Sequence, residues 1–282
     1  MWLYLAIASS VFLGVYDIAK KKSLQRNSVM WVLFSVSVLS TVLLTPFFRF
    51  PGTDVLLMLL PKAALVTLSW ISGLIGMKLL PLTTVSTIKA SRPVFVIVFS
   101  VLLFAERLNA WQWVGVVTAL GALWMLSRSS RKEGIYFSRN RGIWWMGVSV
   151  VSGVCSALYD KYAISQTDPV SVLCWSNLFI TVLMGAVLLV KSLREGAARV
   201  RFTPDWYLLL TAVLIVSADA LYFWSLSGDG ALLSVVSLIR RGAVIVTFTL
   251  SAILFKEGNI RSKAVDLAVM LLGMTILAIA SQ

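Results

Sequence analysis

The sequence predicts an all-α integral membrane protein whose ten transmembrane helices form two inverted repeats of five. The first observation is composition: 59% of the 282 residues are hydrophobic, 13% are charged and the mean hydropathy is +0.90. Soluble proteins carry about 25% charged residues, so this chain has too few charges to cover a water-exposed surface. The second observation is that the apolar residues fall into segments of about 20, the length that crosses a bilayer. The third is a likeness between the two halves of the chain.

Each predicted span is a mostly apolar run bounded by short polar loops. The spans are 2–20, 28–48, 56–79, 82–105, 109–127, 142–165, 169–191, 205–227, 231–255 and 261–280. The longest polar connection, 127–141, lies at the middle of the chain. We therefore expect a first repeat at 1–128, a cytoplasmic linker at 129–140 and a second repeat at 141–282, with no room for a separate catalytic module.

The internal repeat is seen where VLLFAERL ends the fourth span and AILFKEGN ends the ninth, which aligns Glu106 with Glu257. A Tyr-Asp pair also stands in the first and sixth spans. Because five is an odd number, the two halves must enter the membrane with opposite orientations. Inverted repeats are typical of secondary transporters, whose substrate site lies near the midplane. A larger helix bundle without a transport site is the alternative.

The loop charges predict the orientation. One side of the membrane collects seventeen lysines and arginines and the other side four. Since cytoplasmic loops are the basic ones, both termini are predicted on the outer side. The short loops suggest a multi-pass protein of the bacterial inner (plasma) membrane.

The formal net charge is +13, yet no basic stripe interleaved with base-stacking aromatics stands outside the apolar segments. Binding to membrane lipid headgroups explains the charge better than nucleic acid does. The chain has no histidine, and both of its cysteines fall within spans. We therefore expect no metal, no cofactor and no enzymatic activity.

Four basic residues lie inside spans, where each costs about 2.5–3.5 kcal/mol on insertion scales: Lys89, Arg92, Arg240 and Arg241. The offset of the repeat places Lys89 on Arg240, so both halves carry a cation at the same position. Lys89, Arg92 and Ser86 share one helix face. Arginine binds phosphate through two hydrogen bonds and lysine acts as a point charge. The cluster thus predicts a phosphate-type anion site.

The alternative is that these cations pair with acids and hold helices in register. Asp17 and Asp160 have local partners in Lys20 and Lys161, which we expect to occupy them. Asp219 then remains as the central counter-ion. These three acids are also the candidates for proton coupling.

The ten spans, the five-plus-five repeat and the Glu-containing turn after spans four and nine resemble the drug/metabolite transporter superfamily in its EamA-type form. Within it, the plastid triose-phosphate/phosphate translocators are similar at one place, a lysine in the fourth helix and a basic pair in the ninth. The resemblance implies phosphate binding by Lys89 and by the pair Arg240 and Arg241. It does not imply triose phosphate, because Arg92 is an additional cation.

The predicted function is alternating-access transport of a small anionic organophosphate metabolite, by antiport or coupled to protons. Lys89, Arg240 and Arg241 would hold the anion, Arg92 would assist, and Trp70 and Tyr222 would contact the remainder. The alternatives are a flippase for a phosphate-containing polyprenyl lipid, an exporter of amino acids or neutral metabolites, and a membrane subunit that transports nothing. The sequence leaves open whether the protein is a monomer or a homodimer.

Overall fold

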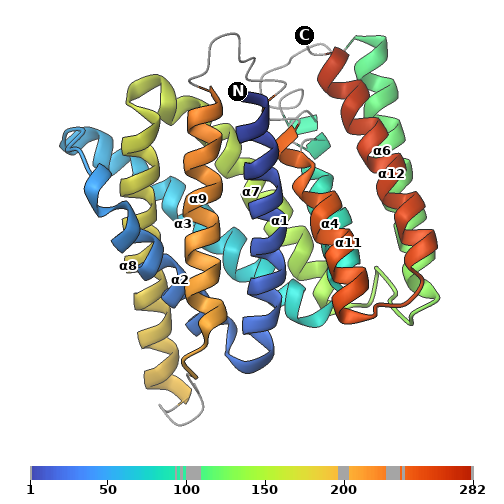
Figure 1. The fold of residues 1–282 in the computed structure, drawn as a ribbon, viewed down its shortest axis with the longest axis horizontal. Helices are drawn as coiled ribbons and strands as arrows, with labels where there is room; N and C mark the ends of the chain where they lie inside the picture. The colour runs from blue at the N-terminus through green and yellow to red at the C-terminus, as the bar shows by residue number, and fades with distance from the viewer. Residues whose placement is uncertain are drawn as a thin grey trace.

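The computed structural model describes residues 2–92, 94–95, 98–99, 109–195, 203–226, 236 and 239–280, and within these ranges it contains helices and no strands (Figure 1). The helices are α1 (Trp2–Arg26), α2 (Val29–Leu44), the 3₁₀ helix η1 (Thr45–Phe47), α3 (Thr53–Leu79), α4 (Leu82–Ala90), α6 (Ala110–Arg131), α7 (Arg141–Gln166), α8 (Pro169–Glu195), α9 (Trp206–Leu226), α11 (Ala243–Phe255) and α12 (Ile260–Ala280). The all-α class is confirmed.

Length and composition explain why these helices suit a bilayer. Among the described residues, seven helices are long and apolar enough to cross a membrane, namely α1, α2 with η1, α3, α6, α7, α8 and α12. Large apolar side chains face outward, including Trp111, Trp144 and Trp206 near helix ends. Tryptophan is enriched at membrane–water interfaces. The outer surface is therefore one that lipid can cover.

Polar side chains fix several helix starts. Asn109 accepts a hydrogen bond from the Gln112 amide at 2.8 Å, while the Gln112 side chain accepts one from the Asn109 amide at 2.9 Å, so the two residues form a capping box for α6. Asn140 caps α7 by accepting from Gly142 N at 2.8 Å. Such caps satisfy amides that have no partner within the first turn.

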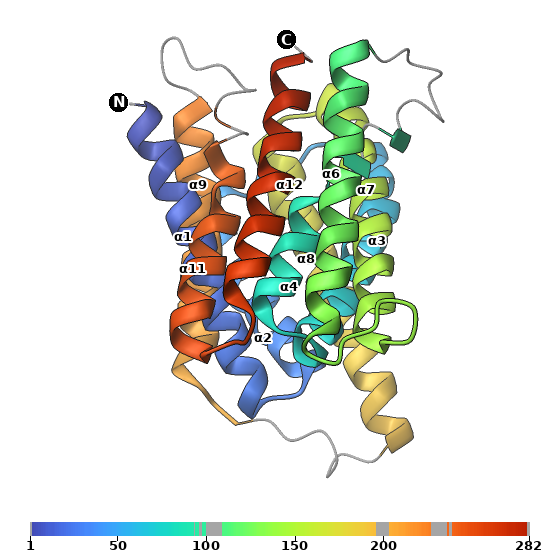
Figure 2. The ribbon, with the colours of Figure 1, turned by 90° about the vertical axis from the view of Figure 1, so that its right-hand side faces the viewer.

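Both chain termini lie at one end of the bundle, which we call the terminal end (Figures 1 and 2). The opposite end carries the connection 132–140 between the two halves, and we call it the linker end. Between the halves, α3 packs on α7, α1 on α9, and α6 on α12. Suppose that each of spans one to five corresponds to the span five places later. The α3–α7 contact then corresponds to the α9–α1 contact, and the α6–α12 contact corresponds to itself. An inverted repeat would produce this pattern; the repeat boundaries themselves stay a prediction.

Two glycines set the distance between α6 and α12. A Cβ on Gly115 would lie 2.9 Å from the Gly273 carbonyl oxygen, and a Cβ on Gly273 would lie 3.0 Å from the Gly115 carbonyl oxygen. Contacts this close leave no space for a methyl group on either helix. Small residues bring membrane helices together in this way.

The helix bounds differ from the predicted spans at a few points. Helix α1 continues to Arg26 and helix α8 to Glu195, beyond the ends at 20 and 191 that were predicted for the first and seventh spans. Hydropathy ends a span at the first charges, whereas a helix continues through lysines and arginines because these are good helix formers. Glu106 lies outside the described residues.

Candidate functional site

A cavity of about 540 Å³ lies between α1, α3, α4, α7, α9 and the start of α11, and we call it the central cavity. It lies well within the bundle, as its α1 and α3 residues are at least five positions from the helix ends. Its lining combines apolar, aromatic and charged side chains. The charged and polar ones are Tyr16, Asp17, Lys20, Ser69, Trp70, Lys89, Arg92, Ser149, Tyr222, Arg240 and Arg241.

Lys89 on α4 forms an ion pair with Asp17 on α1, with 2.8 Å between Nζ and Oδ1. The prediction that Lys20 occupies Asp17 is therefore wrong. The Lys20 ammonium instead contacts the Tyr16 hydroxyl at 2.6 Å and lies 5.7 Å from the Trp70 ring centroid. The packing of α4 on α1 brings Lys89 to the Asp17 carboxylate, so an ion pair between two helices forms in place of the predicted pair between Asp17 and Lys20.

Arg240 pairs with Asp219 on α9 and stacks on Tyr222, with 4.4 Å from its guanidinium carbon to the ring centroid. Cation–π contact and the carboxylate hold the guanidinium from two sides. Its neighbour Arg241 also lines the cavity. The adjacent arginines thus reach one space from the same helical segment.

Arg92 is held in a socket made by α3 and α7. Its Nη2 donates to Ser69 Oγ at 2.9 Å and to the carbonyl and hydroxyl oxygens of Ser149, both at 3.2 Å. Opposite the guanidinium stands Gly153, where a Cβ would lie 2.8 Å from Arg92 Cζ. The socket fixes one edge of the guanidinium with neutral oxygens and leaves its charge uncompensated. Arg92 therefore contributes a positioned positive charge to the cavity.

The cavity holds an excess of positive charge. Five cationic side chains line it, and the carboxylates of Asp17 and Asp219 pair with two of them. The balance is a formal excess of three positive charges. In a low-dielectric interior such an excess attracts anions strongly.

The structure brings most of the predicted site residues together, with one exception. Trp70 and Tyr222 line the central cavity beside the four cations. Ser86 does not: it is 1% exposed, donates to the Thr83 carbonyl at 2.9 Å and does not line the central cavity. Serine in a helix commonly bonds the preceding turn instead of projecting from it. The side chain of Asp160 lies outside the described residues.

Sequence reasoning missed four polar lining residues, Tyr16, Lys20, Ser69 and Ser149. Lys20 was assigned to the basic loops because the first span was ended there, although Tyr16 and Lys20 share a helix face at i, i+4 spacing. Ser69 and Ser149 gave no signal, because serines are common in membrane helices. Only the packing of α3 on α7 places both under Arg92.

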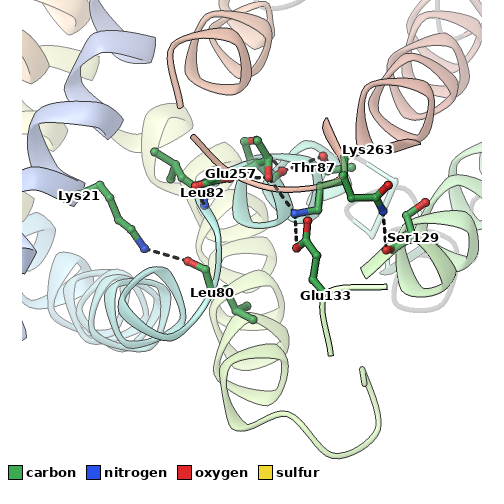
Figure 3. Close-up of polar contacts among 11 residues, drawn as sticks. Lys21, Leu80, Leu82, Thr87, Ser129, Glu133, Glu257 and Lys263 are labelled. Carbon is green, nitrogen blue, oxygen red and sulfur yellow. Dashed lines mark hydrogen bonds and ion pairs between the residues drawn. The ribbon is translucent and has the colours of Figure 1, made fainter. Parts of the chain in front are cut away.

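At the linker end a polar network connects the two halves of the chain (Figure 3). The carboxylate of Glu257, just after α11, accepts hydrogen bonds from the backbone amides of Leu82 at 2.6 Å and Thr83 at 2.9 Å, and from the Thr83 hydroxyl at 2.6 Å. The residue before α4 is Pro81, which offers no side-chain cap. Glu257 from the second half thus caps a helix of the first half.

The same network contains two lysines. Lys263 on α12 is fully buried and donates to Glu133 at 2.6 Å and to the Thr83 hydroxyl at 3.1 Å. Lys21 on α1 donates to the Leu80 carbonyl at 2.8 Å and also to the Met77 carbonyl at the end of α3. We call Lys21, Thr83, Glu133, Glu257 and Lys263 the linker-end network. It joins α1, α3, α4 and α12 across the two halves.

Among the residues that the structure describes, no group of three histidine, cysteine, aspartate or glutamate side chains is arranged to hold a metal ion.

Comparison with known proteins supports a transporter architecture. Residues 1–128 match the model of the EamA-like transporter family. A solved structure described as "Crystal structure of protein" aligns with a TM-score of 0.62 over 99% of this chain and 98% of its own length, at 14% identity. No curated protein sequence matches the chain. The first half therefore carries the sequence signature of a family of membrane transporters, and the whole chain shares its fold with a solved structure.

Proposed function

We propose that the protein is a secondary transporter that moves a small anionic, phosphate-bearing metabolite across the membrane by alternating access. The observation that carries the proposal is the excess of three positive charges in a cavity inside the bundle. Ion pairing, the structural alternative, accounts for two of these cations, Lys89 and Arg240. Arg92 is instead held by serine oxygens, and Arg240 and Arg241 are adjacent, an arrangement suited to phosphate oxygens.

The charge excess also favours exchange over one-way transport. Without substrate, the protein would have to change between its two access states while three unbalanced charges lie in a low-dielectric environment, which is costly in free energy. A bound phosphate dianion removes most of that cost. We therefore expect the loaded carrier to change state faster than the empty one, which is the behaviour of an antiporter.

The flippase alternative requires a lateral route by which a lipid tail leaves the central cavity. The large apolar groove between α3, α4, α6 and α7 shares no lining residue with the central cavity in the part of the chain that the structure describes. A soluble metabolite therefore fits this geometry better than a lipid headgroup.

Proteoliposomes test the proposal. Liposomes that contain the purified protein should take up radiolabelled phosphate several-fold faster when they are preloaded with unlabelled phosphate than when they are not. Arg241→Gln should abolish this uptake, while Arg128→Gln, which removes one positive charge from the exposed surface of α6, should not. A protein that exchanges a neutral amino acid and ignores phosphate would overturn the proposal.

We further propose that the linker end faces the cytoplasm of a bacterial cell and that both termini face outward, because the loops at the linker end are the basic ones. A reporter that is active only in the cytoplasm, fused to residue 282, should be silent. A fusion inserted after residue 138 should be active. The reverse result would invert the proposed orientation.

A further inference from the structure

A second cavity adjoins the central cavity, and phosphate binding in the central cavity assigns no role to it. It measures about 190 Å³ and lies between α2, α3, α8 and α9; we call it the side pocket. Trp70 and Ile215 line both cavities, and Asp219 on its wall is the partner of Arg240 in the central cavity. An anion held by Arg240 and Arg241 would therefore have the side pocket next to it.

The wall of the side pocket is mainly apolar. Leu44, Val66, Leu173, Ile180 and Val216 contribute to it, together with the faces of Trp70 and Ile215. An apolar cavity of about 150 Å³ in another protein holds one benzene molecule. The side pocket thus has room for one six-membered ring.

Five polar residues interrupt the apolar wall: Ser40, Lys62 and Asp219, and two on α8. Asn177 is 9% exposed and Ser176 is 4% exposed, and both line the side pocket. The Asn177 side-chain oxygen and the Ser176 hydroxyl oxygen have no hydrogen-bond partner among the residues that the structure describes. A buried polar atom left in this state costs about 1–3 kcal/mol. Neighbouring atoms cover both oxygens in the ligand-free protein, so a donor that enters the pocket would reach them once the Asn177 and Ser176 side chains rotate.

Resting on the proposed function, we propose that the side pocket is a specificity subsite for the organic part of the substrate: a ring-sized, largely apolar group that carries a hydrogen-bond donor. The phosphate would lie among the cations of the central cavity. The ring would lie beside Trp70, and its N–H or O–H would donate to Asn177 and Ser176. Inorganic phosphate would fill only the first of the two spaces.

Two matched ligands test this assignment. Phenyl phosphate supplies the anion and the ring, while para-aminophenyl phosphate adds one N–H donor at the far end of the ring. One hydrogen bond to an otherwise unpaired acceptor predicts that the wild-type protein binds the amino compound about 5- to 10-fold more tightly. Competition against radiolabelled phosphate on the purified protein measures both affinities.

Variants separate the subsite from the anion site. Asn177→Leu, which keeps the side-chain size, should bring the ratio of the two affinities to about one. Ser176→Ala, a smaller change that preserves folding, should reduce the ratio in the same direction. Arg241→Gln should weaken both ligands at least 10-fold and keep the ratio.

The outcomes are distinguishable. A wild-type ratio near one, or a ratio that Asn177→Leu leaves intact, overturns the subsite while the anion site stands. Equal affinities of wild type and Arg241→Gln for both phosphates overturn the proposed function itself.

Discussion

Replacement of Glu257 by glutamine should open the start of α4. The carboxylate accepts three short hydrogen bonds there, two from backbone amides and one from the Thr83 hydroxyl. A glutamine side chain has one carbonyl oxygen, and its NH₂ group would face an amide that has no other partner in the first turn. At least one charge-assisted bond is lost, at about 2–3 kcal/mol.

This loss has a size that can be measured. At about 1.4 kcal/mol per factor of ten, the local opening equilibrium at the start of α4 should rise about 30- to 150-fold. Hydrogen exchange of the Leu82 and Thr83 amides reports that equilibrium directly. Mass spectrometry of a peptide that starts a few residues before Pro81 and ends near residue 90 should therefore show faster exchange in Glu257→Gln, and a peptide from the middle of α7 should not.

Glu133→Gln is the matched control, because Glu133 contacts Lys263 and leaves both α4 amides capped. Its exchange at Leu82 and Thr83 should stay within a few-fold of wild type. If Glu257→Gln exchanges there within twofold of wild type, the cap contributes nothing and the reasoning fails.

Three further predictions concern the cavity and the packing. Gly153→Ala should lower phosphate affinity about 3- to 10-fold in a binding assay, because the new methyl group displaces the Arg92 guanidinium from a preorganised position; Gly147→Ala, in open space on the same helix, should leave it unchanged, and equal affinities would contradict the socket. Asp17→Asn should lower the melting temperature of the ligand-free protein and enlarge the increase in melting temperature that phosphate produces, since Lys89 then becomes available to the anion. A smaller increase than in the wild type would contradict binding of the anion by Lys89. Gly115→Ala should destabilise the protein by about 1–3 kcal/mol through overpacking of α6 on α12, and an unchanged melting temperature would show that the helices adjust.

The membrane bundle could be predicted from the sequence because hydropathy and length act locally. The same holds for the grouping of the four cations. Lys89 and Arg92 share a face through helix periodicity, and the repeat offset relates Lys89 to Arg240. These relations depend only on spacing along the chain, and the structure places all four side chains on one cavity.

Partner choice could not be predicted, because it depends on which helices pack together. The spacing of Asp17 and Lys20 allows a local pair, but α4 brings Lys89 to the same carboxylate. The socket of Arg92 likewise needs α7 to pass close to α3. The need for a glycine at position 153 arises only from that packing, since no local sequence pattern indicates that residue 153 contacts Arg92.

The cap on α4 has a consequence for synthesis of the chain. Leu82 and Glu257 are 175 residues apart, and at about 5–20 residues per second the ribosome needs about 10 to 35 seconds to add that length. During this interval the start of α4 is already made but lacks its acceptor. The Leu82 and Thr83 amides therefore lack this acceptor until the residue after α11 has been made. Assembly of the halves is a joint event, not the docking of two finished units.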